Sequence, residues 1–207
     1  MVVREVCDGM HILGLLGGVA SGKSLVAGLL AKRGAAVLDA DRAGHEALRL
    51  PEIEAAVRRR WGEGVFGPDG HVDRPRLARI VFAPTYEGKC EREYLEQLTH
   101  PEIARLIRRQ VESLPEDTPL AVLDAALILE AGWGKLCDRL VFVEAPPEVR
   151  LARAMARGWT PDEFSAREAA QESLDFKRRR ADVIIDNSGS PEDTESEIAR
   201  LWQSLIG

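Results

Sequence analysis

A glycine-rich turn between an apolar run and a helical stretch constrains the fold of this chain more than any other feature. The turn, residues 17–24, reads Gly-Gly-Val-Ala-Ser-Gly-Lys-Ser and matches the pattern Gly-x4-Gly-Lys-Ser/Thr. The apolar run over residues 10–17 is typical of a buried parallel strand, and apolar positions after the turn recur at helical spacing until Gly34. Because this pattern between a strand and a helix is typical of phosphate-binding loops, the sequence predicts an α/β protein that binds a nucleotide.

Each part of the turn has a chemical task. Glycines allow left-handed backbone angles, so that consecutive N–H groups can surround a phosphate, and the N-terminus of the following helix directs its dipole at the same anion. We expect Lys23 to reach the β- and γ-phosphates and the Ser24 hydroxyl to ligate Mg²⁺. The nucleotide-binding residues predicted from the turn are Gly17, Gly18, Val19, Ala20, Ser21, Gly22, Lys23, Ser24 and Leu25.

Four further apolar runs predict strands, at residues 35–39, 119–124, 139–143 and 182–186. Helical patterns lie between them, and one closes the chain over residues 191–206. Strands that alternate with helices form βαβ units. We therefore predict a P-loop α/β fold in three layers, α/β/α, with a five-stranded parallel sheet.

Residues 42–114 differ from the rest of the chain, because charged stretches with helical periodicity replace the strand-like runs. The full length of 207 residues allows one domain with an insertion and is short for two ordinary domains. We therefore expect a helical insertion at 42–114 and a nucleotide-binding core formed by 1–41 and 115–207.

Charge, cysteine spacing and hydropathy indicate the compartment and the partners of the protein. The 28 basic and 34 acidic residues give a net charge of −6, which disfavours a protein that binds nucleic acid over its whole surface. Cys7, Cys90 and Cys137 are scattered, as is typical of free thiols in a reducing compartment. We find no apolar stretch long enough to cross a bilayer, and the charged residues within 1–8 argue against a signal peptide. We expect a cytoplasmic protein with no membrane or nucleic-acid partner.

The residues after the second predicted strand bear on the class of nucleotide-binding protein. A GTPase should carry an Asn-Lys-x-Asp motif, but the only asparagine of this chain is Asn187. Asp39 and Asp41 end the second strand, and the carboxyl ends of parallel strands border the ligand crevice. A carboxylate there can orient an acceptor hydroxyl and accept its proton. The alternative is that both aspartates only end the strand and cap the next helix.

The turn followed by Val37-Leu-Asp-Ala-Asp41 closely resembles the opening of the dephospho-CoA kinase family. The resemblance continues in order and spacing along the chain and leaves only the first nine residues outside. Three departures, Ala126, Leu129 and Trp159, stand where the family usually has Pro, Phe and Leu, and Glu172-Ser173 replaces a common Met-Pro. The later segments that resemble the family are Asp73-Arg74 with Leu77 and Val81-Phe82, His100-Pro101 after Leu95 and Leu98, Asp124 with Leu127 and Glu130, Arg167 with Gln171, Lys177, Ala181-Asp182 and Asp186-Asn-Ser-Gly189.

The resemblance implies ATP-dependent phosphorylation of the ribose 3′-hydroxyl of dephospho-CoA to give CoA and ADP, the last step of coenzyme A synthesis. It implies Asp41 as the base on that hydroxyl, with Lys23 as a second catalytic residue. Asp39 would be a support or a contact to a Mg²⁺-bound water. The cofactors implied are ATP and Mg²⁺, and the insertion at 42–114 would bind the CoA moiety.

Further roles follow from the resemblance. Arg150, Arg153 and Arg157 lie at helical spacing. Either they form a solvated face, or Arg153 or Arg157 clamps the transferring phosphate at the edge of a small lid over about 158–180. Asn187 and Gly189 would form the loop against the adenine. The residues implied for the acceptor are Asp41, Arg74, His100, Asp124, Glu130 and, with Gln171 on the far side of the lid, Arg167. For Asp124 and Glu130 the alternative is that they hold Mg²⁺-bound waters, and the sequence does not separate the two roles.

Three alternatives stay open. The chain could be another small-molecule kinase, such as a nucleoside monophosphate kinase, a non-catalytic nucleotide-binding or switch module, or a nucleic-acid binder. For the last, the basic runs 177–180 and 58–60 are better explained as solvated helix ends, the first with one or two phosphate contacts. We expect dephospho-CoA as the partner and a monomer or small homo-oligomer.

Overall fold

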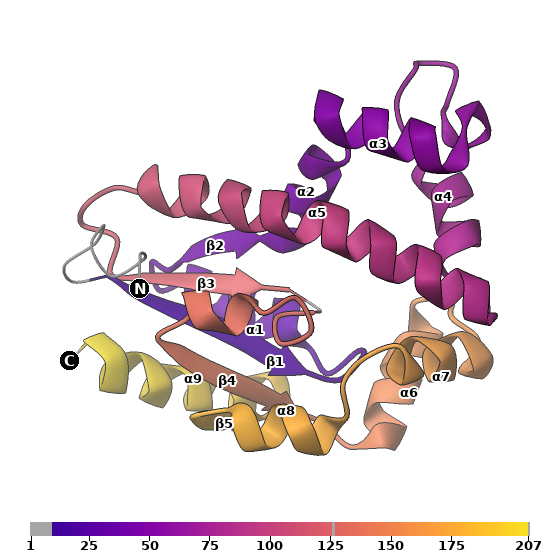
Figure 1. Ribbon diagram of the computed structural model, residues 1–207. Helices are drawn as coiled ribbons and strands as arrows, with labels where there is room; N and C mark the ends of the chain where they lie inside the picture. Colours follow the sequence, from indigo (N-terminus) through magenta and orange to yellow (C-terminus); the bar gives the residue numbers. More distant parts are fainter. Residues whose placement is uncertain (1–9, 126, 207) are drawn as a thin grey trace. The chain divides into compact units, whose positions relative to one another are not determined.

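The computed structural model describes residues 10–125 and 127–206, and in this part of the chain five strands form one sheet (Figure 1). All neighbours pair in parallel, in the order β2-β3-β1-β4-β5. The predicted five-stranded parallel sheet is therefore confirmed. The strands are β1 (His11–Gly17), β2 (Ala36–Asp39), β3 (Leu120–Asp124), β4 (Arg139–Glu144) and β5 (Val183–Asp186).

The chain divides into two compact units, which are described separately. The first runs to Asp39 and resumes at Val111, and the second is Ala40–Gln110. The sheet belongs to the first unit, and the second is helical. The acceptor-binding role expected for residues 42–114 stays a prediction.

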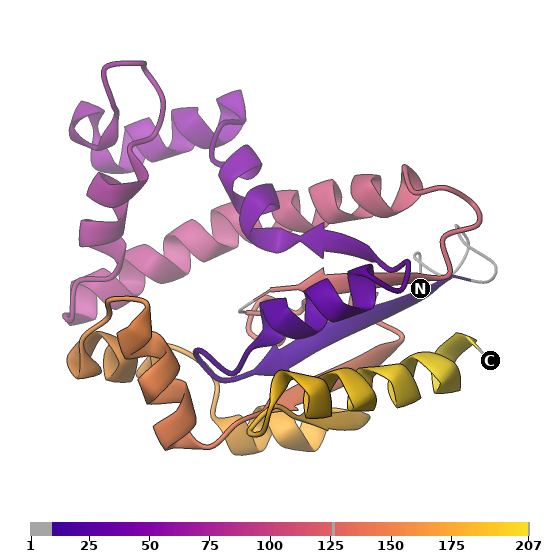
Figure 2. The ribbon, with the colours of Figure 1, turned by 180° about the vertical axis from the view of Figure 1, so that it is seen from behind.

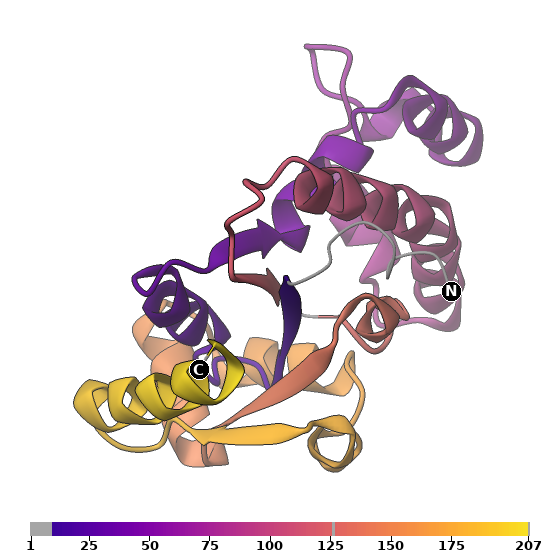
Figure 3. The same cartoon turned by 90° about the vertical axis from the view of Figure 1, so that its left-hand side faces the viewer.

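Helices cover both faces of the sheet in the first unit. Helices α1 (Lys23–Ala31) and α9 (Pro191–Ile206) lie together on one face (Figure 2), and α8 (Leu174–Arg180) lies on the other. The edge-on view shows α1 and α9 on one side of the strands and α8 on the opposite side (Figure 3). The expected three-layer α/β/α arrangement is confirmed. The remaining helices of this unit are the 3₁₀ helix η2 (Trp133–Leu136), α6 (Pro147–Ala156) and α7 (Pro161–Ala169).

The apolar runs read from the sequence form the core of this unit. Leu13 and Leu15 of β1 are buried in one cluster with residues of β3, β4, β5, α1 and α9. Central parallel strands are covered on both faces, so they read as continuous apolar runs rather than alternating patterns. The strand ends are therefore held firmly in place, and the loops that follow them begin from a rigid edge.

The second unit has a core of its own. It contains α2 (Ala40–Ala47), α3 (Pro51–Trp61), the 3₁₀ helix η1 (Glu63–Val65), α4 (Arg74–Val81) and most of α5 (Tyr86–Glu112). Asp73 caps α4 by accepting a hydrogen bond from the backbone N–H of Arg76, which is the usual task of an aspartate at this position. The buried residues of this core are Ile53, Val57, Val65, Phe66, Leu77 and Val81.

Some predictions fall outside the described residues, namely those on the first nine residues, with Cys7 and the segment argued not to be a signal peptide, and the departure at Ala126. Cys90 and Cys137 are free thiols, as expected. Among the described helices, none has the length and apolar character that crossing a membrane requires.

Candidate functional site

The phosphate loop connects β1 to α1 and is held in an unusual backbone conformation. Ala20 has φ +57° and Gly22, which precedes the first helical residue, has φ +99°. A side chain at Gly22 would also collide with the amide of Asn187. Only glycine meets both conditions at position 22, so the loop pattern read from the sequence has a direct structural reason.

Side chains from distant elements hold the carbonyl oxygens of the loop. Asn187 Nδ2 donates to the Ser21 carbonyl at 2.7 Å, and Arg153 Nη1 donates to the same oxygen at 3.3 Å. In a trans peptide the C=O and N–H groups point in opposite directions. Anchoring the Ser21 carbonyl from behind therefore turns the N–H of Gly22 toward the other side, where a phosphate can accept from it.

Lys23 and Ser24, at the end of the loop, both form contacts within the first unit. Lys23 Nζ lies 3.5 Å from the Gly17 carbonyl and 3.4 Å from the Gly18 carbonyl, folded over the loop. Ser24 Oγ donates to Asp124 Oδ2 at 2.9 Å. The Lys23 side chain therefore lies against the start of the loop, and Ser24 lies at the carboxyl end of β3.

Asp39 and Asp124 lie side by side at the carboxyl edge of the sheet. They are register partners at the ends of β2 and β3. Among the described residues, no group of three or more His, Cys, Asp or Glu side chains could hold a metal ion. A hydroxyl and one or two carboxylates are nevertheless the donors that Mg²⁺ takes from a protein when phosphates and waters complete its shell. The residues present fit Mg²⁺ bound together with a nucleotide.

Asp41 belongs to the second unit. It is exposed in the first turn of α2, two residues beyond Asp39 along the chain. A carboxylate in a first turn is stabilised by the helix dipole, so this position agrees with the helix-start alternative as well as with the role of a base. The catalytic role of Asp41 stays a prediction.

The three arginines of α6 do not share one environment. Arg150 is 1% exposed, so the solvated-face alternative is wrong for this residue. Arg153 is half-buried and also donates to the Asn187 carbonyl at 2.9 Å. Arg157 caps the end of α6 and is exposed. The structure therefore places Arg153, rather than Arg150, against the carbonyl of Ser21.

The predicted lid region contains α7 and α8. Arg167 of α7 is exposed, and its guanidinium stacks on the ring of Trp159 with 4.0 Å to the centroid. The family departure at Trp159 thus has a visible consequence, because a cation–π contact holds Arg167. Thr160 and Glu163 form a capping box at the start of α7, and hydrogen bonds from Thr160 lower the pKa of Glu163 below its ordinary value.

Lys177 corrects the interpretation of the basic run. Its side chain is buried, with Nζ 3.0 Å from Glu130 Oε1 and 2.9 Å from Gln171 Oε1. Lys177 is therefore no part of a solvated helix end, although the three arginines after it are exposed as expected. Glu130 Oε1 also accepts from the Glu172 backbone N–H at 2.9 Å. This carboxylate ties the chain after β3 to the connection between α7 and α8.

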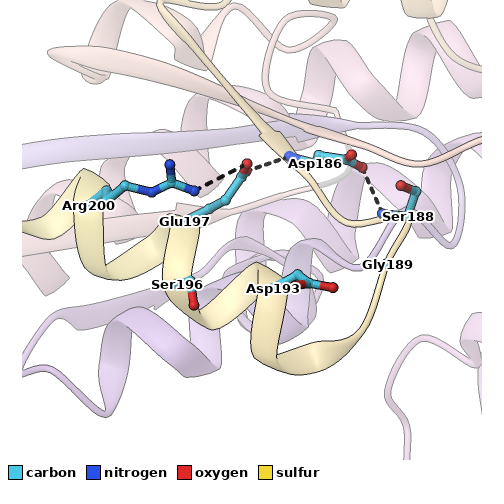
Figure 4. A pocket seen from close by; sticks show the side chains of 7 residues that line it. All are labelled: Asp186, Ser188, Gly189, Asp193, Ser196, Glu197 and Arg200. Carbon is cyan, nitrogen blue, oxygen red and sulfur yellow. Dashed lines mark hydrogen bonds and ion pairs between the residues drawn. The ribbon is translucent and has the colours of Figure 1, made fainter.

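Asn187 and Gly189 follow β5, and their environments differ. Asn187 is buried, and besides its bond to Ser21 its Oδ1 accepts from Thr194 Oγ1 at 2.9 Å. Both the nitrogen and the oxygen of its side-chain amide are thus hydrogen-bonded within the protein. Gly189 lines a pocket of about 280 Å³ (Figure 4). The other residues that line this pocket are Asp186, Ser188, Asp193, Ser196, Glu197 and Arg200.

This pocket has an acidic lining with local structural tasks. Glu197 accepts from the backbone N–H of Asp186 at 2.8 Å and pairs with Arg200, and Asp186 accepts from Ser188. Hydrogen bonds from Ser190 lower the pKa of Asp193. Three carboxylates oppose the binding of a phosphate chain, so the pocket is not where the phosphates of a nucleotide would lie.

Besides Asp41, two further predicted acceptor residues lie in the second unit. Arg74 begins α4, and its Nη1 lies 3.3 Å from His45 Nδ1 of α2. His100 is on α5, where burial disfavours the charged ring and lowers its pKa below 6.5. His45 was not singled out from the sequence, because a lone histidine in a charged helix carries no recognisable signal.

Comparison with known proteins identifies the family. A family model described as dephospho-CoA kinase matches residues 11–193. The chain belongs to the dephospho-CoA kinase family. Dephospho-CoA kinase of Symbiobacterium thermophilum is 45% identical over 202 residues, which cover 96% of this chain and 82% of that protein. A crystal structure from Thermus thermophilus has a TM-score of 0.82 at 36% identity, covering 97% of this chain and 100% of the other. Dephospho-CoA kinase from Campylobacter jejuni has a TM-score of 0.70 at 25% identity, covering 95% and 98%.

Membership of the dephospho-CoA kinase family confirms the predicted enzyme class. The protein is an ATP-using phosphotransferase, and its place is the last step of coenzyme A synthesis. This finding contradicts the alternative of a non-catalytic switch. Sequence reasoning missed Arg150, Lys177 and Thr194 as buried polar residues around the site of this dephospho-CoA kinase, because burial of a single polar side chain leaves no pattern in a sequence.

Proposed function

We propose that the protein transfers the γ-phosphate of ATP to the ribose 3′-hydroxyl of dephospho-CoA, giving CoA and ADP, through the residues described above. The observation that carries the proposal is the phosphate loop with its Ser21 carbonyl anchored from behind and Ser24 bonded to Asp124 at 2.9 Å. Such a loop is already shaped for a phosphate before the ligand arrives, and phosphoryl transfer depends mainly on positioning and on neutralisation of charge.

The donor phosphates would be bound by the loop. Backbone N–H groups of residues 18–24 and the N-terminus of α1 provide donors and a favourable dipole. Lys23 exchanges its two carbonyl contacts for the β- and γ-phosphates, which are far stronger acceptors for an ammonium group. Arg157 at the end of α6 would support the transferring phosphate directly, whereas Arg153, which donates to the Ser21 carbonyl at 3.3 Å, would support it by positioning the loop.

Mg²⁺ would be held by Ser24 and Asp124, with Asp39 as support through a water. A hydroxyl has one proton and two lone pairs, so Ser24 can keep its hydrogen bond to Asp124 and still offer an oxygen to the metal. When bound, the ion would neutralise negative charge on the phosphates of ATP. Asp124 then orients Ser24 and keeps its oxygen directed to one place.

The proposed acceptor residues have different tasks. Asp41 takes the proton of the attacking 3′-hydroxyl as a general base. Arg74 supplies a positive charge for the phosphates of dephospho-CoA, whereas His100 acts as a neutral hydrogen-bonding group, because its lowered pKa keeps the ring uncharged at pH 7. Glu130 and Arg167 are the further acceptor residues in this proposal.

The setting of the enzyme is proposed as well. We infer a cytoplasmic enzyme, active as a monomer or small homo-oligomer, whose partners are ATP and dephospho-CoA rather than nucleic acid or membrane. The free thiols of Cys90 and Cys137 support a reducing compartment.

An acceptor panel tests the proposed function. The purified chain is assayed for ADP release with Mg·ATP and, in turn, dephospho-CoA, AMP, other nucleoside monophosphates and adenosine. We expect turnover with dephospho-CoA alone, with phosphorus NMR locating the new phosphate on the 3′-oxygen. The matched control is Lys23→Ala. This variant should not release ADP, whichever acceptor is added. Turnover with a nucleoside monophosphate and none with dephospho-CoA would contradict the proposal.

A further inference from the structure

We propose that Arg150 is a positioning residue that holds the Val19–Ala20 peptide of the phosphate loop, and that Glu168 of α7 holds Arg150 in turn. The Ala20 N–H is thereby directed at the bound nucleotide. The inference rests on the nucleotide site of the proposed function and adds a residue outside the loop on which phosphate binding depends.

The Val19–Ala20 peptide needs external support. Among the described residues, Ala20 is the one non-glycine residue with positive φ, at +57°. L-residues are strained in the left-handed region, so this peptide would rotate unless something fixed it. Arg150 Nη1 donates to the Val19 carbonyl at 3.4 Å. Because the C=O and N–H groups of a trans peptide point in opposite directions, this contact turns the Ala20 N–H away from Arg150.

The guanidinium of Arg150 has little freedom to move. The side chain is 2% exposed, Nε donates to the Ala145 carbonyl at 3.1 Å, and Nη1 forms an ion pair with Glu168. Its carbon Cζ lies 5.5 Å from the centroid of the Phe164 ring.

The loop closes tightly against this group. A Cβ added to Gly18 would stand only 2.6 Å from Nη1 of Arg150. The arginine behind the loop therefore requires glycine at position 18. Position 18 is variable in the motif, so the task of Gly18 is specific to this chain.

The contacts of Arg150 connect three parts of the first unit. Ala145 precedes α6, Val19 is in the loop, and Glu168 and Phe164 are on α7. A buried guanidinium needs both its charge and its N–H groups satisfied, so loss of Glu168 weakens the hold on Val19. The seating of α7 thus affects the phosphate loop through one side chain. By contrast, Arg33 forms an ion pair with Glu195 at 3.7 Å in which both side chains are partly exposed.

Nucleotide binding and amide NMR test this role. The full chain and the variants Arg150→Met, Arg150→Lys and Glu168→Gln are titrated with ADP, and the amide shifts of Ala20 and Gly22 are followed. We expect Arg150→Met to weaken ADP binding about 10-fold, as loss of one charge-assisted hydrogen bond would. The ADP-induced shift of the Ala20 amide should be lost while that of Gly22, whose peptide is held by Asn187, remains. Lysine cannot reach three partners at once, so we expect the ADP affinity of Arg150→Lys to fall more than twofold.

The control is Arg33→Met, which removes an arginine from its partly exposed pair with Glu195 and should bind ADP as the parent chain does. Thermal unfolding reports whether each variant folds. If Arg150→Met does not fold, Glu168→Gln decides, because its partly exposed side chain can be replaced without burying a new group; a threefold or greater loss of ADP affinity is then expected. ADP affinities within twofold of the parent, or an unchanged Ala20 shift in the folded variants, overturn the role of Arg150. Failure of the parent chain itself to bind ADP instead overturns the nucleotide site of the proposed function.

Discussion

Replacement of Asn187 by alanine tests whether the side chain of Asn187 supports the phosphate loop. The amide of Asn187 donates to the Ser21 carbonyl at 2.7 Å and accepts from Thr194 Oγ1 at 2.9 Å, and the residue is 1% exposed. Alanine removes both hydrogen bonds and leaves a small space behind the loop. We expect a loss of stability and a separate loss of nucleotide affinity.

The loss of stability follows from the partners that remain. The Ser21 carbonyl keeps Arg153 at 3.3 Å, and Thr194 Oγ1 keeps the Ser190 carbonyl at 3.4 Å. Neither group is left without a partner, so each lost bond costs about 1 kcal/mol. With about 1 kcal/mol more for the space left, the total is about 3 kcal/mol, or about 6–12 °C in the midpoint of thermal unfolding for a chain of this size. ATP affinity should fall about 10-fold as the Gly22 N–H loses its orientation.

Thr194→Val is the matched control. It removes the bond on the far side of Asn187 and leaves the bond to Ser21 in place. We expect a stability loss of about 1–2 kcal/mol with ATP affinity within about twofold of the parent chain. Calorimetric titration with ATP and thermal unfolding provide both numbers. Unchanged ATP affinity in Asn187→Ala, or an equal affinity loss in Thr194→Val, would refute the reasoning; a changed preference between ATP and GTP would instead support contact of Asn187 with the adenine.

Three further predictions concern other sites. Asp124→Asn should raise the Mg²⁺ concentration for half-maximal activity about 10-fold, measured by ADP release; an unchanged requirement would exclude Asp124 from the metal site. Burial lowers the pKa of His100 below 6.5, so the unfolded chain binds a proton that the folded chain does not, and stability falls as the pH drops below 6.5. Urea unfolding at pH 7.5 and 5.5 should show a smaller fall in His100→Gln, and an equal fall would contradict this assignment. Burial raises the pKa of Cys137 to about 12. In a variant whose other cysteines are replaced by serine, Cys137 should therefore react with a disulfide reagent at pH 8 about 100-fold more slowly in the folded chain than in the unfolded chain. Comparable rates in the two states would contradict the burial of Cys137.

The sheet and the phosphate loop could be predicted from the sequence because both leave local patterns. Strands buried on both faces are continuous apolar runs, and each of the five was predicted within one residue of its observed ends, as β4, expected over 139–143, ends at Glu144. The final helix has its predicted bounds, Pro191–Ile206, since an amphipathic pattern followed a proline at its start. The glycines and Lys23 of the loop have fixed spacing that chemistry imposes.

The support of the loop could not be predicted in the same way. Helical spacing grouped Arg150 with Arg153 and Arg157, but burial of Arg150 depends on α7 and on the loop, which are far from it in sequence. Lys177 stands in a run of basic residues that looks solvated, and only Glu130 and Gln171 in three dimensions show otherwise. Tertiary contacts of single polar residues therefore set the limit of what this sequence predicts.

The role of Asp41 is decided by the turnover of Asp41→Asn with Mg·ATP and dephospho-CoA, together with its affinity for ATP. Asparagine keeps the size of the side chain and removes its ability to take the proton of the 3′-hydroxyl. A general base contributes about 10²- to 10⁴-fold to the rate, so kcat should fall by that factor while ATP binds as it does to the parent chain. Turnover at the parental rate would contradict the central claim that Asp41 is the base of this kinase.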